Sequence, residues 1–385
     1  MVREVPSSFA AAAEDSYTAF ESAKRWKERT GGSALGYFPV YFPEELAHAM
    51  GLLPVGLYGA SGRLSLDMAT AHTQSFICSI SRSVFQMALQ GNLAVFDGLV
   101  FSNICDVARN LSGITKRNLG TTYVDYLHYP VNNGSAYAAR YLRKEYARIA
   151  AGLEKITGEP LQAEELQSSI EMHNEKRSLL RQLAVLRQSQ PWLLPYTEWY
   201  ATMRAGSIMP VEDYIPALRS YLKEVSSREA RPMDRIRVVI AGTFCEQPPL
   251  PLMKTIEDAG CYIVRDEALI GQRWMGVVSA TESDPLASLA RAYVANSEPL
   301  TVRFHPDIDK RARFAELIAS TGAQGAIFCT PKFCEPALYD SVIFKGVLEK
   351  AKIPYLHLEY EESASSFEHD RTMVETFAES ILFEE

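Results

Sequence analysis

Short apolar segments alternate with helical segments, once in each half of the chain, and this pattern limits the possible folds more than any other feature. The apolar segments have the length of strands and are rich in branched and aromatic residues. They occupy residues 34–38, 53–57, 97–101, 237–242, 261–265, 325–329 and 354–358. Helical periodicity covers residues 8–30, 43–50, 79–91, 250–260, 309–321, 339–351 and 368–382. This alternation is typical of parallel α/β sheets.

The middle of the chain follows a different pattern. Residues 135–192 are rich in Arg, Lys and Glu and have helical periodicity with a break near residues 158–160, which predicts a helical hairpin. Residues 193–232 are also expected to be helical, with Pro210 and Pro216 interrupting the helices.

Together these patterns predict an α/β protein with two Rossmann-like or flavodoxin-like parallel-sheet lobes joined by a helical segment. The expected boundaries are residues 1–134 for the N-terminal lobe, 135–232 for the helical segment and 233–385 for the C-terminal lobe. Open parallel sheets bind ligands beyond the carboxyl ends of their strands. The cleft between the lobes is therefore the expected place of a functional site.

Composition argues against several classes of function. Asp and Glu outnumber Lys and Arg by 47 to 39, a net charge of −8, which disfavours a nucleic-acid-binding face. The N-terminal residues lack the apolar core of a signal peptide, and no apolar run is long enough to predict a membrane span. We therefore expect a cytoplasmic protein that binds neither nucleic acid nor a membrane.

The six cysteines need an interpretation other than disulfide bonds, because disulfides are rare in the cytoplasm. Cys78 precedes a predicted helix, Cys105 follows the strand at 97–101, and Cys334 follows the strand at 325–329. Junctions of this kind face the expected cleft. Considered singly, each cysteine is better explained as a small buried apolar residue.

Three thiolates from two lobes favour an iron–sulfur cluster over zinc, because structural zinc sites usually contain close Cys-x-x-Cys pairs and this sequence has none. A cubane cluster normally takes four thiolates, so three would leave one iron with an open position. Cys245 also follows a strand toward the cleft, whereas Cys261 and Cys329 fit positions in the core. A double cluster that uses all six cysteines is for this reason the less favoured alternative.

Several motifs occur in a fixed order along the chain. They are residues 41–54 (YFPEELAHAMGLLP), 76–83 (FICSISRS), 97–106 (DGLVFSNICD), 242–246 (GTFCE), 271–273 (GQR) and 330–336 (TPKFCEP). Together they resemble the family of 2-hydroxyacyl-CoA dehydratases and benzoyl-CoA reductases, over about residues 30–380. Within that family the sequence is most similar to the smaller cluster-bearing subunit of ATP-dependent benzoyl-CoA reductases. Dehydratase subunits share the three cysteines and a similar length.

The resemblance implies a site. It assigns Cys78, Cys105 and Cys334 to a [4Fe–4S] cluster between the lobes and places Glu45 near an acyl-CoA substrate. Many family members have Arg-Thr-Arg near the C-terminus, where this chain has Thr372 followed by Met373. Any contact that the second arginine makes in the family is therefore without support here.

The resemblance also implies a reaction and partners. The partners are a related cluster-bearing sister subunit, a separate ATP-hydrolysing activator and a ferredoxin as the upstream electron donor. The chain itself has no phosphate-binding loop motif. The implied reaction is low-potential reduction of benzoyl-CoA to a cyclic dienoyl-CoA. The alternatives are radical elimination of water from a 2-hydroxyacyl-CoA and a non-catalytic electron relay.

Ring reduction also needs a proton donor, and the candidates by residue type are Glu45, His48, His72 and His128. Glu45 and His48 belong to one predicted helix, whereas a structural role is the favoured interpretation for His72 and His128. Glu45 also fits the first turn of that helix, where a carboxylate is favourable, and His48 fits the surface. Arg82, one turn after Cys78, either stabilises the negative charge of a cluster or pairs with Asp106. Basic residues considered for the phosphates of coenzyme A are Lys116, Arg117, Arg140, Arg143, Lys144, Arg273 and Lys332.

Overall fold

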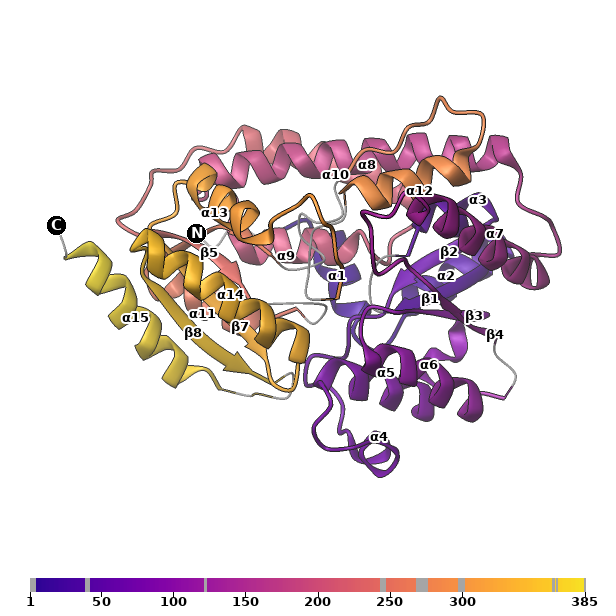
Figure 1. Cartoon of the computed structure of the whole chain (residues 1–385), viewed down its shortest axis with the longest axis horizontal. Helices are drawn as coiled ribbons and strands as arrows, with labels where there is room; N and C mark the ends of the chain where they lie inside the picture. Colours follow the sequence, from indigo (N-terminus) through magenta and orange to yellow (C-terminus); the bar gives the residue numbers. More distant parts are fainter. Residues whose placement is uncertain are drawn as a thin grey trace.

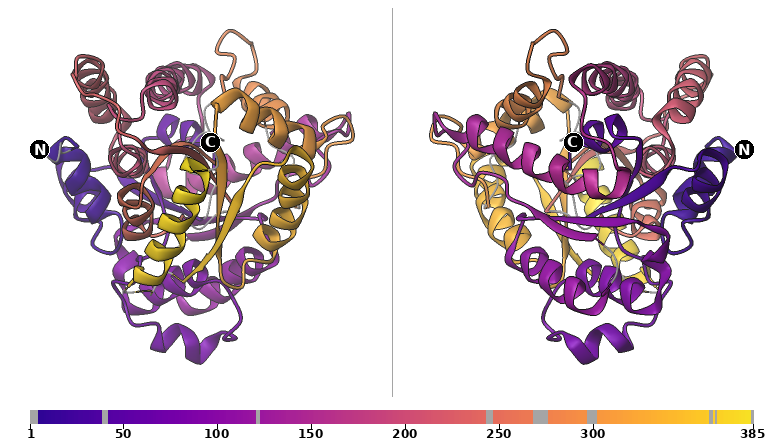
Figure 2. Two further views of the ribbon diagram at one scale, coloured as in Figure 1. Left: turned by 90° about the vertical axis from the view of Figure 1, so that its left-hand side faces the viewer. Right: turned by 90° about the vertical axis from the view of Figure 1, so that its right-hand side faces the viewer.

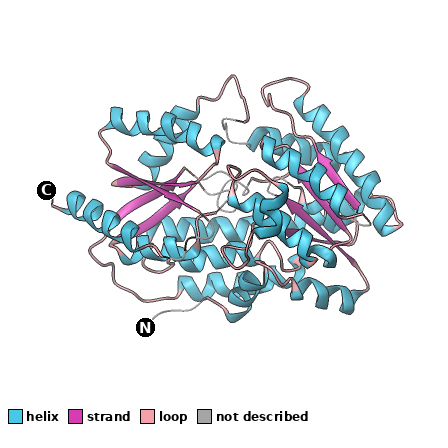
Figure 3. Cartoon of the chain, turned by 90° about the horizontal axis from the view of Figure 1, so that it is seen from below, coloured by secondary structure: helices cyan, strands magenta, loops and turns pink. Residues whose placement is uncertain are grey.

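Two four-stranded sheets, in which all strand pairs are parallel, form the framework of the molecule. The computed structural model describes residues 5–38, 42–120, 123–242, 247–267, 276–296, 302–361, 364 and 366–383. Figures 1 and 3 show the two sheets as separate groups of strands on opposite sides of the molecule. The predicted α/β fold with two parallel-sheet lobes is confirmed.

The first sheet has the strand order β2-β1-β3-β4. Its strands are β1 (Ser33–Phe38), β2 (Leu52–Gly56), β3 (Gly98–Ser102) and β4 (Tyr123–Leu127). Every residue of β3 is buried, as expected for a strand with structure packed on both faces of the sheet. The helices between these strands are α3 (Glu44–Ala49), α4 (Asp67–His72), α5 (Ser79–Gln90), the 3-10 helix η1 (Asn92–Val95) and α6 (Asp106–Asn118).

The second sheet repeats this arrangement with the order β6-β5-β7-β8. Its strands are β5 (Ile236–Ala241), β6 (Cys261–Asp266), β7 (Gly325–Pro331) and β8 (Tyr355–Tyr360). The accompanying helices are α11 (Leu250–Asp258), α13 (Lys310–Thr321), α14 (Glu335–Ala351) and α15 (Glu368–Leu382). In both sheets the chain moves from the second strand across the first to the third. The point where the strand order reverses therefore lies between the first and third strands, where ligands of such sheets bind.

The predicted helical region consists of α7 (Ala138–Thr157), α8 (Ala163–Ser189), α9 (Tyr196–Ala205) and α10 (Val211–Ser226). Gly158 ends α7 in the left-handed conformation, with φ of 76°, so the expected break is confirmed. Helix α8 packs against α3 and α10 and also contacts β6, and Figures 1 and 2 show it along one side of both sheets. No helix in the described ranges combines the length and apolar character needed to cross a membrane.

One helix from the C-terminal part of the chain packs on the N-terminal side of the molecule. Helix α12 (Pro285–Asn296) lies against α7, and Figure 1 shows it beside α7 and α8. Arg143 on α7 pairs with Asp284, just before α12, at 2.8 Å. Beyond α12, Phe304 forms a parallel β-bridge with Asn132. The chain therefore crosses to the first sheet after β6 and returns for α13.

Two predicted elements differ from the structure. The helix expected at 8–30 is divided into α1 (Ser7–Asp15) and α2 (Glu21–Thr30). The division arises because the Asp15 carboxylate accepts hydrogen bonds from the N–H groups of Glu21 and Ser22, at 2.7 and 2.9 Å, and so caps a new helix. Pro216 lies inside α10 and does not end it, because the buried face of α10, with Tyr214 among its residues, holds the helix in place. Elements β4, α4, α6 and α12 were not predicted at all.

Candidate metal centre

Cys78, Cys105 and Cys334 each occupy the position directly before a helix. They are the N-cap residues of α5, α6 and α14. The first backbone N–H groups of a helix have no partner inside it, and the aligned peptide dipoles give this end a partial positive charge. All three cysteines therefore lie beside a helix end that attracts negative charge.

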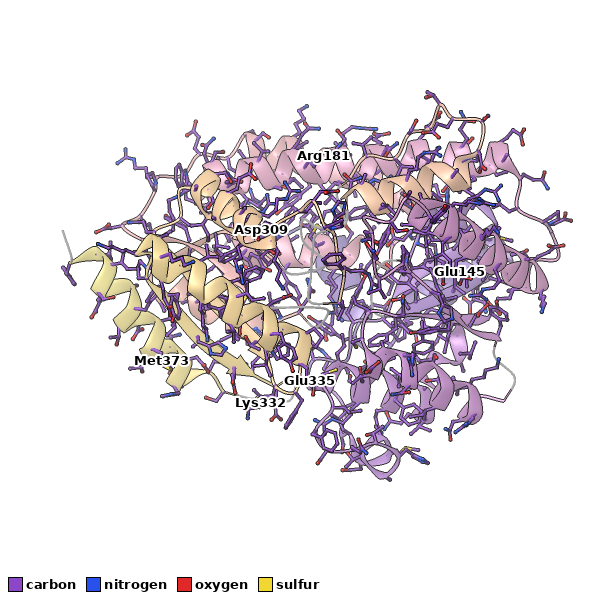
Figure 4. The ribbon with its side chains drawn as sticks, viewed as in Figure 1. Glu145, Arg181, Asp309, Lys332, Glu335 and Met373 are labelled. Atoms are coloured by element: carbon purple, nitrogen blue, oxygen red, sulfur yellow. The ribbon has the colours of Figure 1, made fainter. Side chains whose placement is uncertain are left out.

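The three cysteines line one cavity of about 1220 Å³. Its walls come from α4 and the loop before α5, from α6 with the loop before it, and from the start of α14. Cys78 and Cys334 are each 5% exposed, and Cys105 is partly buried. Figure 4 labels Glu335, which lines the cavity directly after Cys334. Residues that lie far apart in the sequence thus meet around one space.

Cys105 and Cys334 hold equivalent places in the two sheets. Cys105 begins the helix after β3, the third strand of the first sheet, and Cys334 begins the helix after β7, the third strand of the second. Both thiols thus lie near the carboxyl end of a third strand, beside the reversal of strand order. Cys78 has no such counterpart and precedes the helix that leads toward β3.

Hydrogen bonds and burial both act on the Cys105 thiol. The Ala108 N–H donates to the sulfur of Cys105 at 3.4 Å, and the sulfur of Cys78 lies 3.3 Å from the hydroxyl of Ser81. Burial nevertheless raises the pKa of the Cys105 thiol, and the N–H groups of α6 offset this only in part. Cys105 is therefore a neutral thiol at pH 7 until a cation replaces its proton.

The donor set fits a cluster and does not fit a single metal ion. Among the residues that the structure describes, no three His, Cys, Asp or Glu side chains are close enough to hold one ion. In a [4Fe–4S] cluster each thiolate binds a different iron, so the cysteines surround the cluster and do not converge on one atom. Three thiols on separate walls of one cavity suit that geometry.

Two of the remaining cysteines are core residues, as predicted. Cys261 in β6 and Cys329 in β7 are both fully buried among apolar side chains. Burial raises the pKa of Cys261 to about 12, as for an inert thiol. Cys245 lies outside the described residues.

The loop before Cys334 has an unusual backbone conformation. Phe333 has a φ of 63°, in the left-handed region that residues with a Cβ rarely adopt. The turn lets the N–H of Cys334 donate to the carbonyl of Pro331 at 3.2 Å. Phe333 itself remains 43% exposed and lines the cavity. Strain of this kind is common where surrounding structure fixes a functional loop.

Arg82 lies one turn into α5, where its backbone N–H donates to the carbonyl of Cys78. Its guanidinium forms no ion pair with Asp106 in the described part of the chain, so the second of the two predicted arrangements is absent. The Nε atom of Arg82 is buried without a hydrogen-bond partner among the described residues. Arg82 is not among the described residues that line the cysteine cavity, so its charge-stabilising role stays a prediction.

Glu45 is a buried carboxylate in an ion pair on α3. Arg177 on α8 donates to it at 2.5 Å, and both side chains are less than 10% exposed. Burial alone would raise the pKa of Glu45, but the charge of Arg177 outweighs this and holds the pKa at about 2. The described residues around the cysteine cavity do not include Glu45. Its role as a proton donor stays a prediction.

His48 belongs to the same region as Glu45 and not to the cysteine cavity. Its Nδ1 lies 2.7 Å from the hydroxyl of Ser169, and its Nε2 lies 2.9 Å from the carboxylate of Glu212. It lines a separate cavity of about 90 Å³. The structure therefore keeps Glu45 and His48 apart from the three cysteines, whereas His72, another of the candidate donors, lines their cavity.

The basic residues considered for coenzyme A are distributed unevenly. Arg117 on α6 lines the cysteine cavity, whereas Lys332 is half-exposed and pairs with Glu361 at 3.2 Å. Figure 4 shows Lys332 beside Glu335, and Met373 farther along the lobe, where it packs against the core. Among the described residues, the remaining candidates do not line the cavity: Lys116, Arg140, Arg143 and Lys144. Arg273 lies outside the described residues.

Three polar residues on the cavity wall were missed by the sequence analysis: Arg109, Tyr126 and Arg303. The hydroxyl of Tyr126 is buried and has no hydrogen-bond partner among the described residues. Arg303 is only 3% exposed. No motif marks these residues, because they come from α6, from β4 and from the segment after α12, which meet only in the folded protein.

The fold and the cysteine cavity define a protein with two parallel α/β lobes and a thiol-lined site between them. Residues 39–381 match the family model described as 2-hydroxyglutaryl-CoA dehydratase, D-component, and the chain belongs to this family. It is 36% identical over 364 residues to a benzoyl-CoA reductase subunit of Thauera aromatica, and the alignment covers 94% of each chain.

Two dehydratase subunits are also similar. The chain is 27% identical to the (R)-phenyllactyl-CoA dehydratase beta subunit of Clostridium sporogenes, over 92% of this chain and 93% of the relative. It is 28% identical to the lactoyl-CoA dehydratase beta subunit of Anaerotignum propionicum, over 92% and 94%. The family thus includes reductases and dehydratases that act on CoA thioesters.

Proposed function

We propose that this chain is the iron–sulfur subunit of a benzoyl-CoA reductase and that Cys78, Cys105 and Cys334 hold a [4Fe–4S] cluster in the cavity. The observation that supports the proposal is the convergence of three helix N-caps, each a cysteine, on one cavity between the lobes. Core cysteines have no reason to share helix ends and a cavity, as Cys261 and Cys329 illustrate.

The side chains around the cavity suit low-potential chemistry. When bound, such a cluster supplies single electrons at low potential. Apolar side chains from both lobes, among them Ile77, Ile114 and Phe333, form part of the cavity wall. Iron binds the thiolate form of cysteine, so iron must replace the proton of the Cys105 thiol, whose pKa is raised by burial. Arg117 offers a positive charge on the cavity wall for an acyl-CoA phosphate.

The reductase assignment rests on similarity, since the 36% identity to a benzoyl-CoA reductase subunit exceeds the 25–28% identity to dehydratase subunits. All four relatives are named as subunits, which supports a sister subunit for this chain. We further propose that a separate ATP-hydrolysing activator, supplied by a ferredoxin, delivers the electrons. A dehydratase subunit is the second candidate, and the names of three relatives favour it.

The cluster assignment is tested by iron and acid-labile sulfide analysis of the anaerobically purified complex. Replacement of Cys78, Cys105 or Cys334 by Ser is expected to remove about four irons per chain, with loss of the corresponding EPR signal. Cys261→Ser and Cys329→Ser are the matched controls, because both residues are buried in strands away from the cavity. Full iron content in the Cys334→Ser protein would refute the assignment.

The reaction is tested by counting electrons. With the reduced activator and ATP, a reductase consumes two electrons for each dienoyl product, whereas a dehydratase needs only a catalytic amount. Formation of many product molecules per electron from a 2-hydroxyacyl-CoA would overturn the reductase assignment in favour of the second candidate. If substrate leaves the EPR signal of this subunit unchanged and the sister subunit alone reacts, the relay alternative holds.

A further inference from the structure

Arg303 is a buried arginine on the wall of the cysteine cavity. It comes from the short segment after α12 and is 3% exposed. Its Nε donates to the hydroxyl of Tyr293 at 3.0 Å, and its Nη1 donates to the carbonyl of Val302 at 2.9 Å. Both Nη atoms also donate to the carbonyl of Asn103, at 3.3 and 3.2 Å.

Asn103 connects this guanidinium to Cys105. Asn103 lies two residues before Cys105 in the turn that follows β3. Its side chain accepts from the N–H of Tyr129 at 2.7 Å and donates to the carbonyl of Tyr129 at 2.8 Å. The carbonyl of Asn103 then receives both guanidinium N–H groups of Arg303. The turn before Cys105 is therefore held from one side by the residues after β4, and from the other by Arg303.

The position of Arg303 is itself fixed by the crossing of the chain. The N–H of Phe304 donates to the carbonyl of Val131, and the N–H of Asn133 donates to the carbonyl of Phe304, both at 2.8 Å. These two bonds form the bridge that places residue 303 against the first sheet. An arginine far along the sequence thereby joins the wall that Cys105 and Cys334 share.

We propose that Arg303 is a positioning residue for the cluster: it fixes the turn that presents Cys105 and supplies the positive charge that stabilises the reduced cluster. This inference rests on the proposed function, since it needs a cluster in the cavity. Reduction adds one negative charge to the cluster, and a buried cation on the cavity wall favours that state. The fork of two N–H groups on one carbonyl requires a guanidinium, and a lysine ammonium cannot also reach Tyr293.

Two variants separate the roles of geometry and charge. Arg303→Lys keeps the charge and loses the fork, so the midpoint potential is expected to stay near that of the wild type while a chelator removes iron about tenfold faster. Arg303→Met loses both, so the midpoint potential in an EPR redox titration of the complex shifts to a more negative value. Asp284→Asn is the matched control, because it removes the ion pair with Arg143 in the same crossing segment without touching the cavity.

A further readout does not need the cluster. In the iron-free chain, alkylation of Cys105 is measured by peptide mass spectrometry relative to Cys78. Arg303→Lys is expected to accelerate it several-fold, because the turn before Cys105 loses its support. If the wild-type complex contains no iron, the proposed function fails, whereas the alkylation ratio still tests the support of the turn. The inference is overturned if both Arg303 variants equal Asp284→Asn in the rate of iron loss, in the midpoint potential and in the alkylation ratio.

Discussion

Replacement of Glu45 by Gln is expected to lower the free energy of unfolding by about 3 kcal/mol at pH 7. The value follows from the pKa of Glu45, which burial tends to raise but Arg177 holds at about 2 instead of 4.5. A difference of one pKa unit corresponds to about 1.36 kcal/mol between the two protonation states. The folded protein therefore stabilises the Glu45 carboxylate by about 3 kcal/mol, and glutamine cannot supply that charge.

The same shift determines how the effect depends on pH. Because the folded pKa lies below the unfolded one, the stabilisation is fully present above pH 4.5 and is lost as the pH falls toward 2. The difference between the wild type and Glu45→Gln should thus decrease from about 3 kcal/mol at pH 7 to about 2 kcal/mol at pH 3.5. Urea unfolding followed by the fluorescence of the four tryptophans measures both values.

Glu212→Gln provides the matched control. Glu212 binds His48 in the same region, but its side chain is 54% exposed, so its loss should cost less than about 1 kcal/mol. Equal losses for the two variants would refute the reasoning. Glu45 would then not be a carboxylate fixed by Arg177, and its protonated form would be available as a proton donor.

Two further predictions concern other parts of the molecule. Burial lowers the pKa of His173 from 6.5 to about 4, so the free energy of unfolding should decrease by up to about 3 kcal/mol as the pH drops from 6.5 to 4. In a series of urea-unfolding measurements over this pH range, His173→Gln should remove that part of the decrease. Phe333→Gly should leave the free energy of unfolding unchanged or raise it by up to about 1 kcal/mol, because Phe333 has a positive φ and glycine removes the strain. By contrast, Phe344→Ala, which truncates a buried side chain on α14, should lower the free energy of unfolding by about 3–5 kcal/mol. A similar loss for Phe333→Gly would contradict the conclusion that the backbone of Phe333 is strained.

The sheets were predictable because their central strands are buried on both faces. Strands such as β3 and β7 are then continuous apolar segments, and glycine or proline residues mark where they begin or end. Strand β4 escaped prediction because Tyr123, Asp125 and Tyr126 are only partly buried, so its apolar pattern is weak. The positions of Cys78, Cys105 and Cys334 near strand–loop–helix junctions could be located from the same pattern, whereas their selection as cluster ligands came from the family resemblance and stays a prediction.

The remaining features depend on contacts between distant parts of the chain. The division of the first helix requires the Asp15 carboxylate to turn toward the N-terminus of α2, which helical periodicity does not reveal. In the sequence, Lys176 and Arg177 look like solvated charges on a helix. In the structure both are buried against α3, where they form ion pairs with Glu44 and Glu45. Arg303 reaches Asn103 only because the chain crosses between the lobes. The local pattern of the sequence does not reveal contacts of this kind.

The origin of the cavity in both lobes has a consequence for biosynthesis. The ribosome makes every strand from β1 to β7 before it reaches Cys334, and α14 must then pack on the second sheet before Cys334 takes its place. An N-terminal fragment that ends before α14 contains only Cys78 and Cys105 of the three cavity thiols. Long-range assembly of this kind is slow compared with helix formation. If the cavity holds the proposed cluster, iron therefore reaches it after translation, in a chain whose two lobes have already docked.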